Sequence, residues 1–156
     1  MQPNLSCGIR KISVNSPLTV WSDTNVLLRI ITGDPPKMVE EVKQLVQMVD
    51  QGQLVLKIPS IVIAECCWVL ESLYGYNPPD IAQALINIIN AKGMDMEEKS
   101  LVLEALRDYD QQHVDYIDAY IAAKARSSSH PYVVTWNHKH FSRLRVKHDK
   151  PHQVQF

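Results

Sequence analysis

The change from strand to helix that decides the fold lies in the stretch 18-LTVWSDTNVLLRIIT-32. Its apolar start, Leu18 to Trp21, predicts a short buried strand, and the apolar residues between Asn25 and Thr32 recur at helical spacing. Asp23 and Thr24 stand between the two, where a carboxylate can cap the first turn of the helix. A short apolar strand that leads directly into a capped helix is typical of an α/β fold.

The same alternation continues along the chain. Further strands are predicted at 54–58, at 131–135 and at 153–156, and helices at 37–51, 60–73, 80–91, 97–109, 116–127 and 138–144. This order indicates an α/β fold with a mainly parallel sheet. Residues 1–17 are polar and show neither period, so we interpret them as an N-terminal extension and residues 18–156 as a single domain.

Length and composition indicate an ordinary globular protein. The chain has 156 residues, of which 46% are hydrophobic and 21% are charged, which suits one compact domain. No apolar run approaches the roughly 20 residues that cross a bilayer, so we expect no membrane association and a cytoplasmic location. Two of the three cysteines, Cys66 and Cys67, are adjacent on a predicted helix, and we expect them to be reduced packing residues.

Charge is distributed unevenly along the chain. Residues 1–123 carry 9 Lys/Arg and 16 Asp/Glu, whereas residues 124–156 carry 7 and 1. A basic C-terminal segment can attract a polyanion, but a solvated basic surface explains the same pattern. Charge alone therefore does not identify a substrate.

Four acidic residues lie among apolar neighbours: Asp23, Glu65, Asp115 and Asp118. Glu65 is the clearest case, because it lies in 61-IVIAECCWVL-70 with no basic residue within seven positions. A buried carboxylate is costly unless it is paired or holds a metal. We therefore expect a divalent cation to compensate this set.

The predicted elements place these carboxylates near one another. Asp23 follows the first strand, Glu65 is on the helix after the second, and Asn137 follows a later strand, so all are expected at the carboxyl edge of a parallel sheet. Asp115 and Asp118 differ by three positions and share one face at the start of a helix. Clustered carboxylates suit Mg²⁺ or Mn²⁺, and such a site hydrolyses phosphodiesters with a metal-activated water. Nucleic acid is the expected class of substrate.

Simpler interpretations exist for single residues. Asp23 or Asp115, taken alone, is explained as a helix cap, whereas Glu65 in mid-helix is not. Trp136 is expected in the core, although it can also stack on a base. The remaining candidates are histidines whose spacing matches no zinc motif, and we expect them at the surface or near phosphate: His138, His140, His148 and His152.

Four motifs, in this order, resemble those of the PIN-domain ribonucleases: Asp23 to Arg29, Ser60 to Leu70, Asp115 to Ala119 and Val133 to Asn137. The set is most similar to the VapC-type toxins of toxin–antitoxin pairs. The resemblance implies a three-layer α/β/α domain, metal-dependent RNA cleavage, homodimers and an antitoxin that blocks the site.

The resemblance also implies roles for individual residues. By position, Asp23, Glu65 and Asp118 are the metal ligands, and Asp115 is a supplementary acidic partner. Asn137 departs from the family, which often has aspartate there, and its neutral amide oxygen leaves the number of metal ions open. Polar supports around the site are expected at Thr24, Asn25, Ser60 and Thr135.

The leading hypothesis is therefore a Mg²⁺- or Mn²⁺-dependent endoribonuclease that acts as a toxin and is restrained by a partner protein. Two alternatives stay open. One is a non-catalytic domain of the same fold that binds RNA or protein, which Asn137 and the basic C-terminal segment favour. The other is a structure-specific DNA nuclease, which shares the metal chemistry.

Overall fold

The computed structural model of the chain describes residues 16–154 and shows short strands alternating with helices. The predicted extension, residues 1–17, lies outside the described residues except for its last two positions. In chain order the elements are β1 (Leu18–Trp21), α1 (Thr24–Thr32), α2 (Pro36–Asp50), β2 (Leu54–Ile58), α3 (Ser60–Ser72), α4 (Pro78–Asn90), β3 (Met94–Met96), α5 (Lys99–Gln112), α6 (Tyr116–Ser127), β4 (Tyr132–Val134), α7 (His138–Phe141), β5 (Lys147–Asp149) and a 3₁₀ turn, η1 (Pro151–Gln153).

Three parallel strands form the first sheet, in the order β1-β2-β3. The sequence predicts β1 and β2 at the observed residues, and Leu18 lies beside Leu54 in their register. It does not predict β3, because Met94–Met96 is only three residues long and lacks β-branched side chains. Pairing with β2, which places Met94 beside Leu56, holds these residues as a strand.

Two parallel strands, β4 and β5, form a separate sheet in which Val133 lies beside His148. The predicted strand around Val133 is confirmed. Of the strand predicted at 153–156, the described part is wrong, because Gln153 belongs to η1 and Val154 is in no strand, whereas residues 155–156 lie outside the described residues. The observed strand is β5. The polar sequence of β5 lacks the apolar alternation that marks a strand, so its conformation depends on pairing with β4.

Local sequence explains the helix ends that position the acidic residues. Asp23 caps α1, since its Oδ1 accepts a hydrogen bond from the N–H of Val26 at 3.2 Å. Gly33 ends α1 at a φ of 66°, a conformation that glycine adopts without strain. Helix α6 has the predicted bounds and follows Asp115. Within residues 16–154, no helix has both the length and the apolar character needed to cross a membrane.

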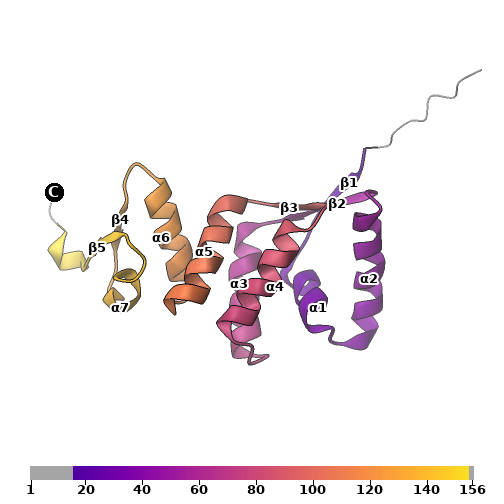
Figure 1. The fold of residues 1–156 in the computed structure, drawn as a ribbon, viewed down its shortest axis with the longest axis horizontal. Helices are drawn as coiled ribbons and strands as arrows, with labels where there is room; N and C mark the ends of the chain where they lie inside the picture. The colour runs from indigo at the N-terminus through magenta and orange to yellow at the C-terminus, as the bar shows by residue number, and fades with distance from the viewer. Residues whose placement is uncertain (1–15, 155–156) are drawn as a thin grey trace, which may run out of the picture.

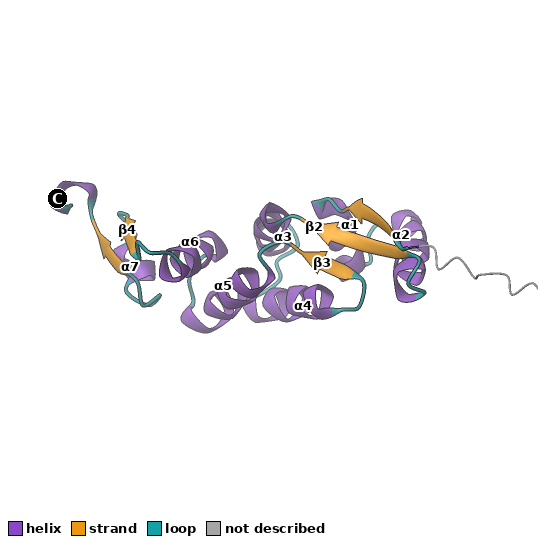
Figure 2. Ribbon diagram, turned by 90° about the horizontal axis from the view of Figure 1, so that it is seen from above, coloured by secondary structure: helices purple, strands orange, loops and turns teal. Residues whose placement is uncertain are grey.

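The two sheets lie at opposite ends of the molecule (Figure 1). Helices α5 and α6 lie between them, and the view from above in Figure 2 shows the same separation. In Figure 1, α1, α2, α3 and α4 all lie on one side of the first sheet, and α3 packs against α4. The α/β fold with parallel strands that the sequence predicts is confirmed, but the sheet is divided into two parts.

One continuous hydrophobic cluster joins the two ends. It begins at Leu27 and Leu28 on α1, passes through α3, α4, α5 and α6, and reaches Phe141, Leu144 and Val146 near the C-terminal sheet. Buried alanines on α6 let this helix pack closely against its neighbours. The C-terminal sheet is therefore fixed to the helices by burial and is not a loose appendage.

Strand β1 is the exception to the predicted burial. The sequence predicts a buried strand, but Leu18 is 63% exposed and Trp21 is 65% exposed. Only β2 lies beside β1 in the described part of the chain, so the other edge of β1 and much of its surface face solvent. The prediction is wrong for a single chain because it assumes neighbours on both sides of this strand.

Candidate metal and active site

A cluster of polar side chains lies where α6 and α7 begin. Asp115 is the N-cap residue of α6, and Asp118 lies in its first turn, where the helix dipole stabilises negative charge. Asn137 caps α7, and its Nδ2 donates a hydrogen bond to Asp118 Oδ2 at 2.7 Å. His140, on α7, has its Nδ1 at 2.7 Å from the same oxygen. Two nitrogen groups therefore hold one oxygen of Asp118.

This cluster has the donor set of a cation site. Ligand atoms of Asp115, Asp118 and His140 lie within 4.8 Å of one another. The side chains of Asp118 and His140 are 18% and 17% exposed, whereas that of Asp115 is 77% exposed. Carboxylate oxygens fit Mg²⁺ or Mn²⁺, whereas imidazole suits softer ions. His140 is therefore better explained as a hydrogen-bond partner of Asp118 than as a ligand of such a cation.

A second acidic group lies at the carboxyl end of β1. Asp23 follows β1 directly, and the buried Thr24 donates a hydrogen bond from its hydroxyl to Glu65 Oε2 on α3. Burial first, and then the charges of Glu65 and Asp23, raise the pKa of the Cys66 thiol to about 12. Cys66 therefore stays protonated and is not a nucleophile.

The structure does not bring the four acidic residues together within one chain. Among residues 16–154, the cluster around Asp118 includes neither Asp23 nor Glu65. Both figures place α1, which follows Asp23, at the other side of α3 and α5 from α6. The four carboxylates thus form two half-sites: Asp23 with Glu65, and Asp115 with Asp118.

The predicted burial of these carboxylates is also wrong. Asp23, Glu65 and Asp115 are exposed, and only Asp118 is half-buried. The apolar neighbours of Glu65 do point into the core, but Glu65 lies on the opposite face of α3. The helical spacing of this face, Ile61, Glu65 and Trp68, is visible in the sequence, and the structure leaves all three residues exposed.

The predicted polar supports have different positions. Thr24 contacts Glu65 as described, and Thr135 Oγ1 accepts a hydrogen bond from the N–H of Asn137 at 2.9 Å, which shapes the turn before α7. Ser60 contacts another carboxylate, because its N–H and its hydroxyl both donate to Glu97 Oε2, at 2.9 and 3.3 Å. Asn25 lies exposed in the first turn of α1. Thr24 and Thr135 are therefore the supports that each serve one half-site.

The sequence predicts His140 at the surface or near phosphate, because the spacing of the histidines matches no zinc motif. The structure instead places its imidazole, which is 17% exposed, against Asp118. The available signal was the spacing of three between Asn137 and His140, which places both side chains on one face of a short helix.

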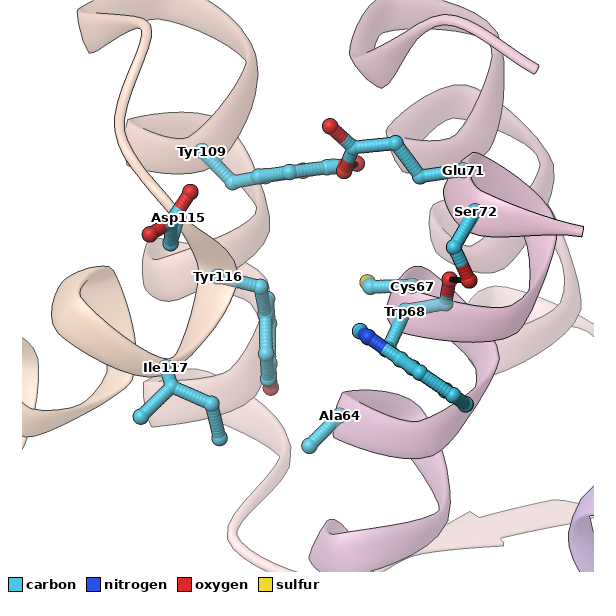
Figure 3. A pocket seen from close by; sticks show the side chains of 9 residues that line it. All are labelled: Ala64, Cys67, Trp68, Glu71, Ser72, Tyr109, Asp115, Tyr116 and Ile117. Carbon is cyan, nitrogen blue, oxygen red and sulfur yellow. Dashed lines mark hydrogen bonds between the residues drawn. The ribbon is translucent and has the colours of Figure 1, made fainter. Parts of the chain in front are cut away.

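An open groove separates α3 from the start of α6 (Figure 3). It has a volume of about 410 Å³, and its lining includes Trp68 and Glu71 on α3 and Asp115 and Ile117 at α6. Tyr116 also faces it, and its hydroxyl is buried without a hydrogen-bond partner among the described residues. The groove thus lies beside the Asp118 half-site and exposes apolar surface on both walls.

Comparisons with known proteins agree with this architecture. The family model described as "PIN domain" matches residues 21–147, which include every acidic residue of the two half-sites. The chain is 28% identical over 131 residues to a protein of Aquifex aeolicus (strain VF5) described as "VapC ribonuclease", a match that covers 84% of this chain and 96% of that relative. No solved structure matches the chain significantly. Because the family model spans most of the chain, the protein belongs to the PIN domain family.

Proposed function

We propose that this protein is a metal-dependent endoribonuclease of the VapC type. The observation that carries the proposal is a set of four carboxylates, all within the family match: Asp23 and Asp115 are helix N-cap residues, Asp118 lies in the first turn of α6, and Glu65 lies on α3 beside Thr24. The relative named as a ribonuclease is matched over 96% of its length, so the likeness extends to the whole domain.

In this proposal Asp23, Glu65 and Asp118 hold Mg²⁺ or Mn²⁺, and Asp115 assists them. When bound, a divalent cation lowers the pKa of a coordinated water and neutralises negative charge on a phosphodiester. The oxygen-rich donor set supports a hard cation over a softer one. Asn137 contributes through its amide contact with Asp118 and is the weakest of the candidate ligands.

The surrounding side chains orient the carboxylates. Thr24 fixes one oxygen of Glu65, and Asn137 and His140 fix one oxygen of Asp118, which leaves the second oxygen of each carboxylate available. Fixing ligand orientation before binding raises the affinity for a metal ion. The basic residues of the C-terminal segment, 7 Lys/Arg against 1 Asp/Glu from residue 124 onward, provide positive potential for a polyanionic substrate.

The biological role that fits this activity is that of a cytoplasmic toxin that forms homodimers and is inhibited by an antitoxin protein. Support for this role comes from the name of the matched relative. A neighbouring small reading frame that encodes a DNA-binding protein would strengthen it.

A non-catalytic RNA- or protein-binding domain is the second candidate. The separation of the two half-sites within one chain favours it, as does the neutral Asn137. Cleavage of DNA in place of RNA is a third candidate that the same carboxylates would support.

Cleavage of RNA and DNA of matched sequence, with Mg²⁺, Mn²⁺ or a chelator, tests the proposal. We expect RNA cleavage that requires metal and falls at least about 100-fold in Glu65→Gln. Asp50→Asn, at the exposed end of α2, is the matched control and should keep full activity. Cleavage that persists undiminished in Glu65→Gln, or with the chelator, would refute the assignment.

A further inference from the structure

In the described part of the chain the two sheets have four outer strands, β1 and β3 in one and β4 and β5 in the other, and the open edges of β1 and β4 are the ones with exposed apolar side chains. The N–H of Leu18 donates to Gln53, just before β2, and the N–H of Ser22, just after β1, donates to Lys57 in β2. Because bonding alternates along a parallel strand, the backbone groups of Thr19 and Trp21 point to the open edge. On β4, the N–H of Thr135 donates to Asp149 at the end of β5, so Val134 points to the other edge. Open edges of this kind readily pair with another strand.

The side chains at these edges are apolar and exposed. Leu18 and Trp21 on β1 expose more than 60% of their surface, and at β4 Val134 is 49% exposed and Trp136 is 75% exposed. Natural proteins usually place charged residues or proline on an edge strand that remains in solvent. Proline occurs only before each of the two strands, at Pro17 and Pro131, and within β1 and β4 no residue is charged or proline, whereas the other outer strands, β3 and β5, contain charged residues. This difference indicates that the edges of β1 and β4 are covered in the functional protein.

The C-terminal unit, residues 114–154, is held too firmly to cover β1 of its own chain. Arg126 on α6 pairs with Glu104 and Asp108 on α5, with distances of 2.6 Å to each carboxylate, and also donates to the carbonyl of Leu144. Arg143 donates to the carbonyl oxygens of Gln112 and His113 at 3.3 and 3.1 Å. Closure within one chain would have to break the ion pairs of Arg126 with α5 and the buried contacts between α6 and α5.

Charge favours contact between the two ends of different copies. Residues 16–113 carry 7 Lys/Arg and 14 Asp/Glu, whereas residues 114–154 carry 7 and 3. The edge strand β1 therefore belongs to an acidic unit and β4 to a basic one. Opposite potentials favour association of β1 with β4 of a second copy over association of like ends.

We propose that two copies of this chain exchange these ends, so that β4 of each copy pairs with β1 of the other. A reciprocal contact of this type closes into a dimer with twofold symmetry. If β4 adds in the parallel sense seen in both sheets, a sheet of order β3-β2-β1-β4-β5 forms, in which the last two strands come from the partner.

The exchange would complete the active site from two chains. Asp23 follows β1 and Asn137 follows β4, so parallel pairing brings both to the same carboxyl edge of the joined sheet. Each site then combines Asp23 and Glu65 of one protomer with Asp115 and Asp118 of the other. The shared active site rests on the proposed function, whereas the pairing of β1 with β4 does not depend on it.

Mixing two inactive variants tests the shared site directly. Asp23→Asn damages one half-site and Asp118→Asn damages the other, and each variant alone should lose metal-dependent RNA cleavage. After mixing, unfolding and refolding together, the mixed dimer contains one site with both halves intact. Random pairing then restores about one quarter of the wild-type specific activity. Sites built from one chain would restore none, and that result would overturn the proposal while the nuclease assignment stands.

Cross-linking gives an answer that does not depend on catalysis. Thr19→Cys and Val134→Cys are placed on separate chains in a Cys7→Ser background and treated with a short bismaleimide, and the single variants incubated alone serve as controls. We expect a covalent dimer only when both chains are present, even if the protein cleaves no RNA. A wild-type monomer by light scattering, or an intramolecular link in the double variant, would instead show that one chain closes on itself or that another partner covers the edges.

Discussion

His140 Nδ1 lies 2.7 Å from Asp118 Oδ2, and the amide of Asn137 donates to the same oxygen from 2.7 Å. Both nitrogen groups come from α7, whereas Asp118 comes from α6, so this contact ties the orientation of the carboxylate to the turn after β4. The turn itself is shaped by the bond between Thr135 and Asn137. This chain therefore holds Asp118 with an amide and an imidazole.

His140→Ala should weaken metal binding and RNA cleavage by about 10- to 100-fold, because hydrogen-bond partners of ligating groups typically contribute that much. Mn²⁺ titration by calorimetry and initial cleavage rates provide the measurements. His152→Ala, on the exposed η1 turn, is the control and should resemble the wild type. An equal loss of metal affinity and cleavage rate in the two variants would show that His140 has no specific role in holding Asp118.

Thr24→Val should reduce activity with a small effect on folding. Valine matches the shape of threonine but cannot donate to Glu65, so the carboxylate loses its fixed orientation. The free energy of unfolding should fall by about 0.5–1.5 kcal/mol, the usual contribution of one hydrogen bond. Urea unfolding and cleavage rates measure the two effects. Thr32→Val, at the other end of α1, removes a hydroxyl that bonds to Leu28 and should leave cleavage intact.

The sequence predicted most of the local structure because local patterns determine it. The capped helix after Asp23 and the bounds of α6 follow from spacing and caps that lie within a few residues. The short strands β3 and β5 were missed because their pairing partners, β2 and β4, are distant in sequence and their own residues show no strand pattern.

The candidate site was less predictable because its geometry is set by tertiary packing. The strand ends placed Asp23 and Asn137 at carboxyl edges, but the sequence contains no signal that the sheet divides between β1 and β4. The burial of Glu65 was overestimated because its neighbours in sequence occupy other faces of α3. His140 was missed because its contact with Asp118 spans two elements.

Arg126→Met should destabilise the protein by about 1–3 kcal/mol, because it leaves Glu104 and Asp108 without their shared partner in a half-buried setting. Methionine keeps much of the apolar stem, so the loss reports the guanidinium contacts. Arg126→Lys retains the charge without the forked geometry, so its stability should lie between that of the wild type and that of Arg126→Met. Urea unfolding curves of the three proteins check this order, and a wild-type stability for Arg126→Met would contradict it.

Stability should also fall at alkaline pH because of Cys66. Burial raises the pKa of this thiol from 9.0 to about 12, so the folded state keeps the proton after the unfolded state has lost it. The contribution is complete below pH 9 and is lost as the pH rises from 9 towards 12, at up to about 1.4 kcal/mol for each pH unit. Cys66→Ala removes this thiol, so its unfolding free energy should decline less steeply than that of the wild type between pH 9 and 10, while Cys67 and the buried tyrosines titrate in both proteins and cancel in the comparison. Urea unfolding at pH 8, 9 and 10 gives the unfolding free energy of both proteins. An equal decline with pH in the two proteins would show that the thiol is not protected by burial.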